Sequence, residues 1–169
     1  IVLASDGVPL HVEIDEPEVR PARLAKGAAI PTVVLCHGYC RGLRSWGFQR
    51  RALRAAGYRV VLWDQRGHGL SGAGSPQSYA IDQLGLDLHA VITAVAPSGP
   101  LVLVGHSMGG MTVMSLAVHY PEIIRDRATG VAFVSTSDGG MSDGSGGPGK
   151  ALGQPGYRVG RGAAGRRAR

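Results

Sequence analysis

A serine flanked by glycines, in the pattern Gly-x-Ser-x-Gly, occurs twice in the chain, and such a serine can serve as a nucleophile. One copy is centred on Ser107 and the other on Ser142. With 27 glycines in 169 residues, chance alone gives ~0.3 matches, so the neighbouring elements must decide between the two copies. Ser107 directly follows a short apolar run and directly precedes a helical stretch, whereas Ser142 has neither neighbour. Ser107 is therefore the predicted nucleophile.

The two glycines around Ser107 have a physical purpose. A serine that turns sharply from strand to helix exposes its hydroxyl, and Gly105 and Gly109 leave room for that turn because they carry no Cβ. Acyl transfer through a serine ester is the chemistry that this arrangement favours. In the alternative, Ser107 only caps the helix that begins at Met108. Functional residues that follow other strands are needed to decide between a nucleophile and a helix cap.

A second motif, His37-Gly38-Tyr39, follows another apolar run and supplies what acyl transfer needs besides a nucleophile. Negative charge develops on the carbonyl oxygen during the reaction. Two fixed N–H donors aimed at that oxygen stabilise it by roughly 3 kcal/mol each. The backbone N–H groups of Tyr39 and Met108 are the predicted donors of this oxyanion hole.

The elements that must position these residues alternate along the chain. Short apolar runs typical of parallel strands alternate with helical stretches, which predicts an α/β fold with helices on both faces of the sheet. Functional residues are then expected at the carboxyl ends of the strands. Residues 1–15 alternate apolar and polar side chains, which predicts an antiparallel hairpin. The predicted strands lie at 32–36, 60–63, 101–104 and 131–134, and the predicted helices at 45–56, 81–95 and 108–120.

Three landmarks, each after a strand, together resemble the α/β-hydrolase family over residues 1–137. They are His37-Gly38, the Asp-Gln-Arg-Gly-His-Gly sequence at 64–69, and the elbow formed by Gly105, His106, Ser107, Met108, Gly109 and Gly110. The resemblance implies a serine hydrolase with the α/β-hydrolase fold, truncated after about the sixth of eight strands. It also implies that His37, Gly38, Gly105, His106 and Gly109 support the site, and that residues 64–69 form a scaffold loop.

The catalytic base is missing from this pattern. In the family the triad runs serine, acid and histidine along the chain, yet no histidine follows His119. His37, His68 and His106 already belong to the landmark motifs, so none is predicted as the base. Asp138 follows the last predicted strand, where some lipase-like members carry the acid, and is the candidate acid.

Several functions remain open at this point. The leading hypothesis is hydrolysis of carboxylic esters or related acyl substrates, without metal or cofactor. Lipase, thioesterase, acyltransferase and cofactor-free haloperoxidase share this half of the fold. Epoxide hydrolase or haloalkane dehalogenase would need a carboxylate at position 107. A non-catalytic binding protein is the alternative from another class, and the missing histidine favours it.

Composition and charge limit the classes of binding partner that the sequence predicts. Residues 138–169 hold six basic residues against two acidic ones, while residues 1–137 hold twelve against ten, so the net charge of +6 lies mostly at the end. A folded basic face for nucleic acid is therefore not predicted. No membrane span or signal peptide is visible, so a cytoplasmic protein without membrane partners is expected. Cys36 and Cys40 are too few for a disulfide framework or a zinc site, and Cys36 is expected inside a strand.

Residues 138–169 form the second predicted region. They are rich in glycine and arginine, which predicts a disordered tail after the hydrolase part at 1–137. Limited trypsin digestion should therefore cleave at Arg158 and Arg161 before it cleaves at Arg54. Equal protection at these sites would show that the tail is ordered.

Overall fold

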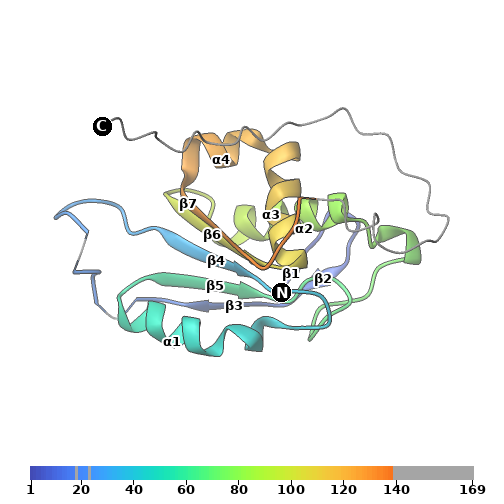
Figure 1. The fold of residues 1–169 in the computed structure, drawn as a ribbon, viewed down its shortest axis with the longest axis horizontal. Coiled ribbons are helices and arrows are strands. Elements are labelled where there is room, and N and C mark those ends of the chain that lie inside the picture. The colour runs from blue at the N-terminus through green and yellow to red at the C-terminus, as the bar shows by residue number, and fades with distance from the viewer. Residues whose placement is uncertain (18, 23, 139–169) are drawn as a thin grey trace, which may run out of the picture. The chain divides into compact units, whose positions relative to one another are not determined.

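The main sheet has five strands, in the order β3-β5-β4-β6-β7 (Figure 1). The computed structural model describes residues 1–17, 19–22 and 24–138. Strand β4 pairs in parallel with β5 and β6, and β6 pairs in parallel with β7. The α/β fold class with a mostly parallel sheet is therefore confirmed. The strands are β3 (Val12–Asp15), β4 (Thr32–Cys36), β5 (Arg59–Trp63), β6 (Leu101–His106) and β7 (Ala128–Val134).

The predicted N-terminal hairpin forms only over its first part. Strand β1 (Val2–Leu3) pairs antiparallel with β2 (Pro9–Leu10) in a separate two-stranded sheet. Strand β3 then leaves the hairpin and pairs antiparallel with β5 of the main sheet. The alternating pattern identifies a half-buried strand but not its partner, because every strand offers the same backbone donors and acceptors for pairing.

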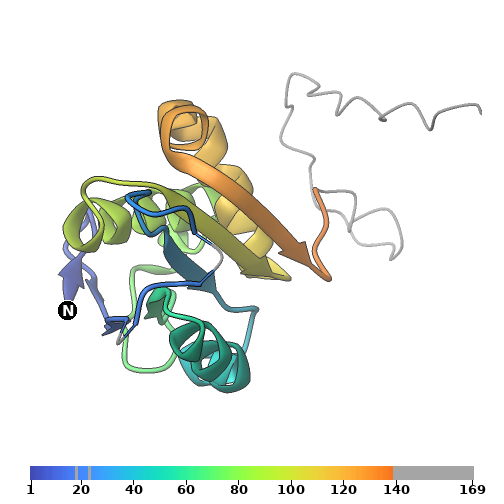
Figure 2. The same cartoon turned by 90° about the vertical axis from the view of Figure 1, so that its left-hand side faces the viewer.

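The helices cover both faces of the sheet (Figure 2). Helix α1 (Gly47–Ala55) lies on one face, after a 3-10 turn, η1 (Leu43–Trp46). The other face carries α2 (Ile81–Val95), α3 (Met108–His119) and α4 (Pro121–Arg127), and a second 3-10 turn, η2 (Pro76–Ser78), precedes α2. Helix α3 ends just before Tyr120, as Pro121 predicts. Helix α4 was not predicted, although proline suits the first position of a helix.

Each face of the sheet has its own core, because successive side chains of a strand point to opposite sides. On the α2 and α3 side the buried strand residues are Val34, Cys36, Val61, Trp63, Leu101 and Leu103. On the α1 side they are Val33, Leu35, Val60 and Leu62, which pack with Leu43 and Trp46 of η1. Cys36 is fully buried, as expected, and burial raises the pKa of its thiol to about 12. Its thiolate is therefore not available near neutral pH.

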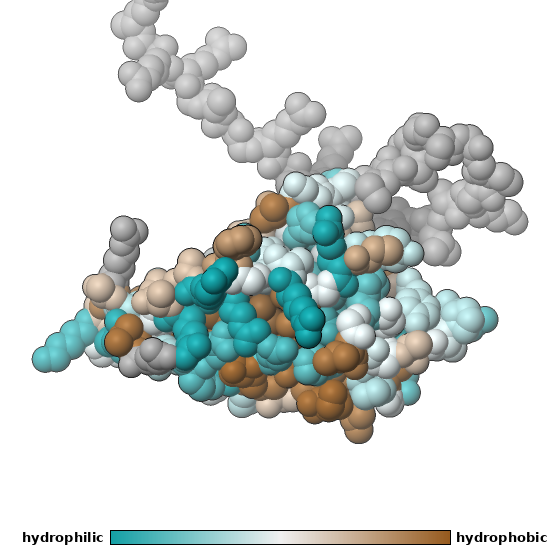
Figure 3. Space-filling model, turned by 90° about the horizontal axis from the view of Figure 1, so that it is seen from below, coloured by the Kyte–Doolittle hydropathy of each residue, from teal (hydrophilic) through white to brown (hydrophobic). Residues whose placement is uncertain are grey.

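Helix α1 is a surface helix. None of its residues is buried, and Phe48 is 79% exposed. Seen from below, this side of the molecule is largely hydrophilic with scattered hydrophobic patches (Figure 3). No helix among the described residues is long and apolar enough to span a membrane.

Strand β7 lies at the edge of the sheet and is the least buried of the long strands. Val131, Phe133 and Val134 are 41%, 49% and 43% exposed. The apolar composition of residues 131–134 was expected to mean burial on both faces, and this part of the prediction is wrong. Within the described part of the chain, no strand pairs with the outer edge of β7.

An ion-pair cluster ties α1 to β3. The guanidinium of Arg50 donates to both carboxylate oxygens of Asp15, at 2.6 Å and 2.8 Å, and to Glu13. Hydrogen bonds from Arg50 lower the pKa of both carboxyl groups below their ordinary values. The carboxylates therefore stabilise the folded chain above those ordinary values, and the stabilisation is lost as pH falls through the lowered folded-state values.

The variant Arg50→Gln tests this coupling. The loss of unfolding free energy relative to the wild type should be largest near neutral pH and should shrink as pH falls below the ordinary values of 4.5 and 3.8. Urea unfolding across this pH range measures it. Arg51→Gln is the matched control, because Arg51 contacts Phe48 and pairs with no carboxylate among the described residues. An Arg50→Gln difference that does not change with pH would contradict the assignment.

Candidate active site

Ser107 has the backbone conformation of a strained turn. It stands between β6 and α3 with φ 51° and ψ −120°, in a region that residues with a side chain rarely adopt. Its N–H donates to the Val134 carbonyl at 2.9 Å, and its own carbonyl accepts from the Gly110 N–H at 2.8 Å. The Thr136 hydroxyl donates to the same carbonyl at 2.7 Å. Neighbours in both α3 and the end of β7 therefore hold the turn.

Glycines are required on both sides of this turn. A Cβ on Gly105 would lie 2.4 Å from the Gly109 carbonyl oxygen, and a Cβ on Gly109 would lie 2.1 Å from the Cys36 carbonyl oxygen. Both contacts are with backbone atoms, which cannot move aside like a flexible side chain. The first turn of α3 thus packs directly against the end of β4.

The loop after β4 lies against the turn. A Cβ on Gly38 would lie 3.2 Å from the Ser107 Cβ and 2.7 Å from His106 Nδ1. Within the described residues, neither the Tyr39 N–H nor the Met108 N–H donates a hydrogen bond. The structure therefore places the predicted nucleophile beside the loop that carries one predicted donor.

His37 is a structural residue in this arrangement. It is fully buried, its Nδ1 bonds the Gly38 carbonyl at 2.8 Å, and its Nε2 accepts from the Gln65 N–H at 2.9 Å. The Gln65 side chain donates to the His37 carbonyl and accepts from the Thr112 hydroxyl at 2.6 Å. Burial lowers the pKa of His37, so its ring stays neutral. Both nitrogens are committed to this network.

Four of the other five histidines have partners for their rings among the described residues. His68 Nδ1 bonds the Arg66 carbonyl at 2.9 Å, and its Nε2 accepts from the Cys40 N–H at 3.2 Å. His89 stacks on Tyr120 with ring centroids 3.6 Å apart, and burial lowers the pKa of its imidazole. His119 contacts Asp82 at 3.3 Å, and His11 contacts Glu13 at 3.4 Å. His106 is half-buried, and its ring makes no hydrogen bond within the described part of the chain.

A model of the alpha/beta hydrolase fold family matches residues 31–150 of the chain. The chain belongs to the α/β-hydrolase family. It is 37% identical over 120 residues to epoxide hydrolase 4 of Mus musculus. The aligned stretch covers 70% of this chain and 33% of that protein. The family match ends beyond the boundary predicted at 137, in a stretch outside the described residues.

Solved structures of hydrolases also resemble this chain. Est816, described as an N-acyl homoserine lactone degrading enzyme, is 26% identical with a TM-score of 0.62, covering 80% of this chain and 45% of that one. An esterase from Exiguobacterium antarcticum shares the fold at 23% identity with a TM-score of 0.68, covering 81% of this chain and 45% of that one. This hydrolase chain spans less than half the length of these relatives.

The loop after β5 is joined to α2 and to the β1–β2 hairpin by charged hydrogen bonds from Arg66. Arg66 is fully buried, and its guanidinium donates twice to the Asp87 carboxylate, at 2.6 Å each, and twice to Asp6, at 2.8 Å and 3.1 Å. The Asp64 carboxylate accepts from the backbone N–H groups of Leu43 and Leu70. These contacts fit the scaffold role that the resemblance implies for this loop.

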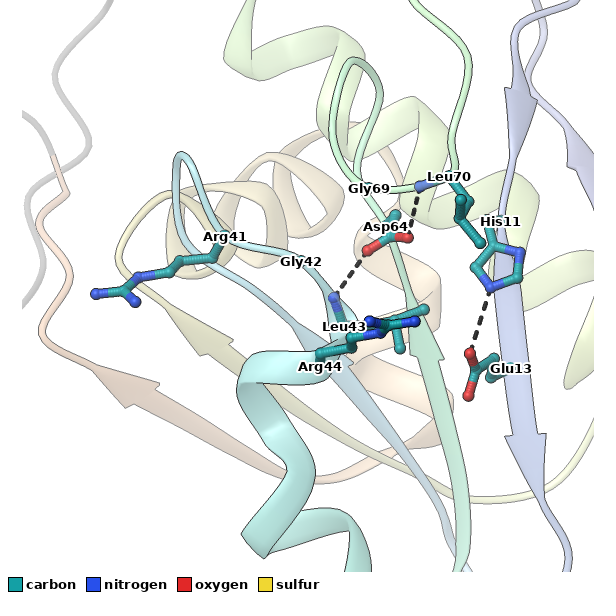
Figure 4. A pocket seen from close by; sticks show the side chains of 9 residues that line it. All are labelled: His11, Glu13, Arg41, Gly42, Leu43, Arg44, Asp64, Gly69 and Leu70. Atoms are coloured by element: carbon teal, nitrogen blue, oxygen red, sulfur yellow. Dashed lines mark hydrogen bonds and ion pairs between the residues drawn. The ribbon is translucent and has the colours of Figure 1, made fainter.

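A cavity of about 380 Å³ lies beside this scaffold loop (Figure 4). Its carboxylates are already engaged, Asp64 by the two backbone N–H groups and Glu13 by Arg50 and His11. Ser107 does not line it, so this cavity is not where the predicted nucleophile acts. The lining residues are His11, Glu13, Arg41, Gly42, Leu43, Arg44, Asp64, Gly69 and Leu70.

The remaining predictions concern the catalytic acid, a metal site and the second serine motif. Asp138 follows the end of β7 and makes no ion pair with a histidine within the described part of the chain. The described residues contain no group of three or more His, Cys, Asp or Glu side chains that could hold a metal ion. Ser142 lies outside the described residues. Sequence reasoning missed Thr136 and Thr112, because a lone threonine carries no motif.

The variant Gly109→Ala tests the packing of the elbow. Its Cβ would overlap the Cys36 carbonyl, so we expect a loss of roughly 1–3 kcal/mol of unfolding free energy. Gly47→Ala is the matched control, because a Cβ there meets nothing within 4 Å. Urea unfolding of both variants measures the difference, and equal stability would show that α3 does not press on β4.

Proposed function

We propose that this chain carries the nucleophile half of a serine hydrolase that acts on carboxylic esters or related acyl substrates. The observation that carries the proposal is the strained Ser107, which turns between strand and helix at φ 51° beside Gly38. A serine that serves only as a helix cap has no need of this strain. Strain held by several hydrogen bonds is typical of functional sites.

In the proposed mechanism, Ser107 Oγ attacks the carbonyl carbon of the substrate. The hydroxyl proton passes to a base, and the carbonyl oxygen becomes an oxyanion near the N–H groups of Tyr39 and Met108. Collapse of this intermediate expels the alcohol, which takes the proton, and leaves an acyl ester on Ser107. Water then hydrolyses that ester by the same steps and regenerates the serine.

The base of this mechanism lies outside the present chain. His37 and His68 use both ring nitrogens in hydrogen bonds, and no histidine follows His119. Asp138 remains the candidate acid because of its position after β7. A longer polypeptide that includes the rest of the hydrolase domain would have to supply the histidine.

The nucleophile favours ester over epoxide chemistry. The relatives include proteins named epoxide hydrolases, but that reaction would need a carboxylate at position 107, where this chain has serine. A structural relative is described as degrading a lactone, which is a cyclic ester.

Ester hydrolysis by the 169-residue chain tests whether the catalytic base lies outside it. The chain should cleave a p-nitrophenyl ester no faster than Ser107→Ala, because loss of the triad typically costs on the order of 10⁶ in rate. In a polypeptide extended to the full domain, a fluorophosphonate probe should label Ser107 and leave Ser142 unlabelled. Turnover by the short chain that is lost in Ser107→Ala would show that the chain supplies its own base, one of His37, His68 and His106, and no labelling of the extended, folded protein would refute the serine hydrolase.

A further inference from the structure

Two connections join the loop after β4 to the loop after β5, and only one of them is buried. The buried one is made by Gln65, which bonds the fully buried His37. In the other, the Cys40 N–H donates to His68 Nε2 at 3.2 Å, and His68 Nδ1 bonds the Arg66 carbonyl at 2.9 Å. Cys40 is exposed and His68 is half-buried, so solvent can reach this second connection.

The backbone partners of His68 fix the protonation state of its ring. An amide N–H can only donate, so Nε2 must present a lone pair to Cys40. A carbonyl oxygen can only accept, so Nδ1 must carry the proton that bonds the Arg66 carbonyl. The ring is thus neutral, with its proton on Nδ1. A second proton, on Nε2, would face the Cys40 N–H, and this hydrogen bond would be lost.

The turn over residues 38–41 depends on this hydrogen bond. The Arg41 N–H donates to the Gly38 carbonyl at 3.2 Å, which closes the turn. Its third residue is Cys40, whose φ of 54° lies in the left-handed region that favours glycine. Backbone strain of this kind persists only where the surrounding structure holds it. His68 supplies the acceptor for the N–H of the strained residue, and it therefore helps to hold the turn.

The ionisable neighbours of His68 are engaged in contacts of their own. The rings of His37 and Tyr39 lie edge-on to the His68 ring, with centroid distances of 5.3 Å and 5.7 Å. Burial lowers the pKa of His37, so that ring stays neutral. The Asp64 carboxylate accepts from two backbone N–H groups, and the Arg66 guanidinium is bonded to two carboxylates. The ionisable side chains of the two loops, besides His68, are those of His37, Tyr39, Cys40, Arg41, Asp64 and Arg66.

We propose that His68 is a positioning residue for the oxyanion hole and holds the turn at 38–41 only while its ring is neutral. Tyr39 is the second residue of this turn, so the turn sets the direction of its N–H, the predicted oxyanion donor. Histidine changes its charge near neutral pH. The bond to Cys40 is therefore present above the pH range in which His68 takes up a proton, and it is lost as pH falls through that range. The inference rests on the proposed function, since the donor matters only if Ser107 forms an oxyanion.

Amide hydrogen exchange of the 169-residue chain tests the proposal, because the Arg41 N–H reports closure of the turn. His68→Phe keeps an aromatic ring but has no acceptor. In this variant the protection factor of the Arg41 amide should fall roughly fivefold, as loss of one hydrogen bond predicts. His68→Gln can offer its side-chain carbonyl to the Cys40 N–H and should restore the protection.

The pH profile distinguishes this role from simple packing. In the wild type, the Arg41 protection factor, corrected for the intrinsic exchange rate, should fall between about pH 8 and pH 5. In His68→Gln it should stay constant over this range, although every other histidine is still present. His89→Phe is the matched control, because His89 stacks on Tyr120 and should leave the Arg41 protection and its pH dependence unchanged. Protected amides of β4 show that each variant is folded.

A second measurement connects the turn to the nucleophile. In a polypeptide extended to the full domain, a fluorophosphonate probe should label Ser107 more slowly in His68→Phe than in the wild type or His68→Gln. No labelling of any variant would refute the proposed function, whereas hydrogen exchange would still show whether His68 holds the turn. Equal Arg41 protection in the wild type and in folded His68→Phe, a pH dependence that persists in His68→Gln, or equal labelling rates would each overturn the proposal.

Discussion

The close approach of α3 to the end of β4 is the constraint on which the rest of the site depends. Gly109 lies so near the Cys36 and His37 carbonyls that no side chain fits between them. With the helix start fixed there, the residue between β6 and α3 must reverse direction within one position. That residue is Ser107, whose positive φ follows from this packing and not from its own preference. Nucleophile geometry here is thus a consequence of backbone contact.

A buried polar network fixes the second half of the arrangement. Gln65 connects the His37 ring and carbonyl to the Thr112 hydroxyl, so one side chain joins the loops after β4 and β5 to helix α3. Every member of this network is paired, and paired polar groups in a low-dielectric interior specify a single arrangement. The same pairing removes His37 from acid–base chemistry. The hydrogen bonds that order this part of the site therefore leave His37 unable to exchange a proton with a substrate.

The sequence indicated the fold class and the strand-to-helix turn at Ser107 because both depend on local signals. Continuous apolar runs predicted β4, β5 and β6, Pro121 predicted the end of α3, and glycine spacing predicted the elbow. Partnerships between distant segments were not predictable in this way. The pairing of β3 with β5 and the role of Thr136 depend on three-dimensional proximity, which no short pattern encodes. For β7, the apolar run indicated the strand but not the exposure of its side chains.

The strand order also has a consequence for synthesis on the ribosome. Strand β4 has β5 on one side and β6 on the other. In the sequence, α2 separates β5 from β6. Emerging residues can therefore complete one edge of β4 early, while the other edge waits until Leu101–His106 has been translated. Closing so long a loop carries an entropic cost before any contact repays it. During that interval the nascent chain exposes the edge of its most buried strand, and it is then that a chaperone would have most to protect.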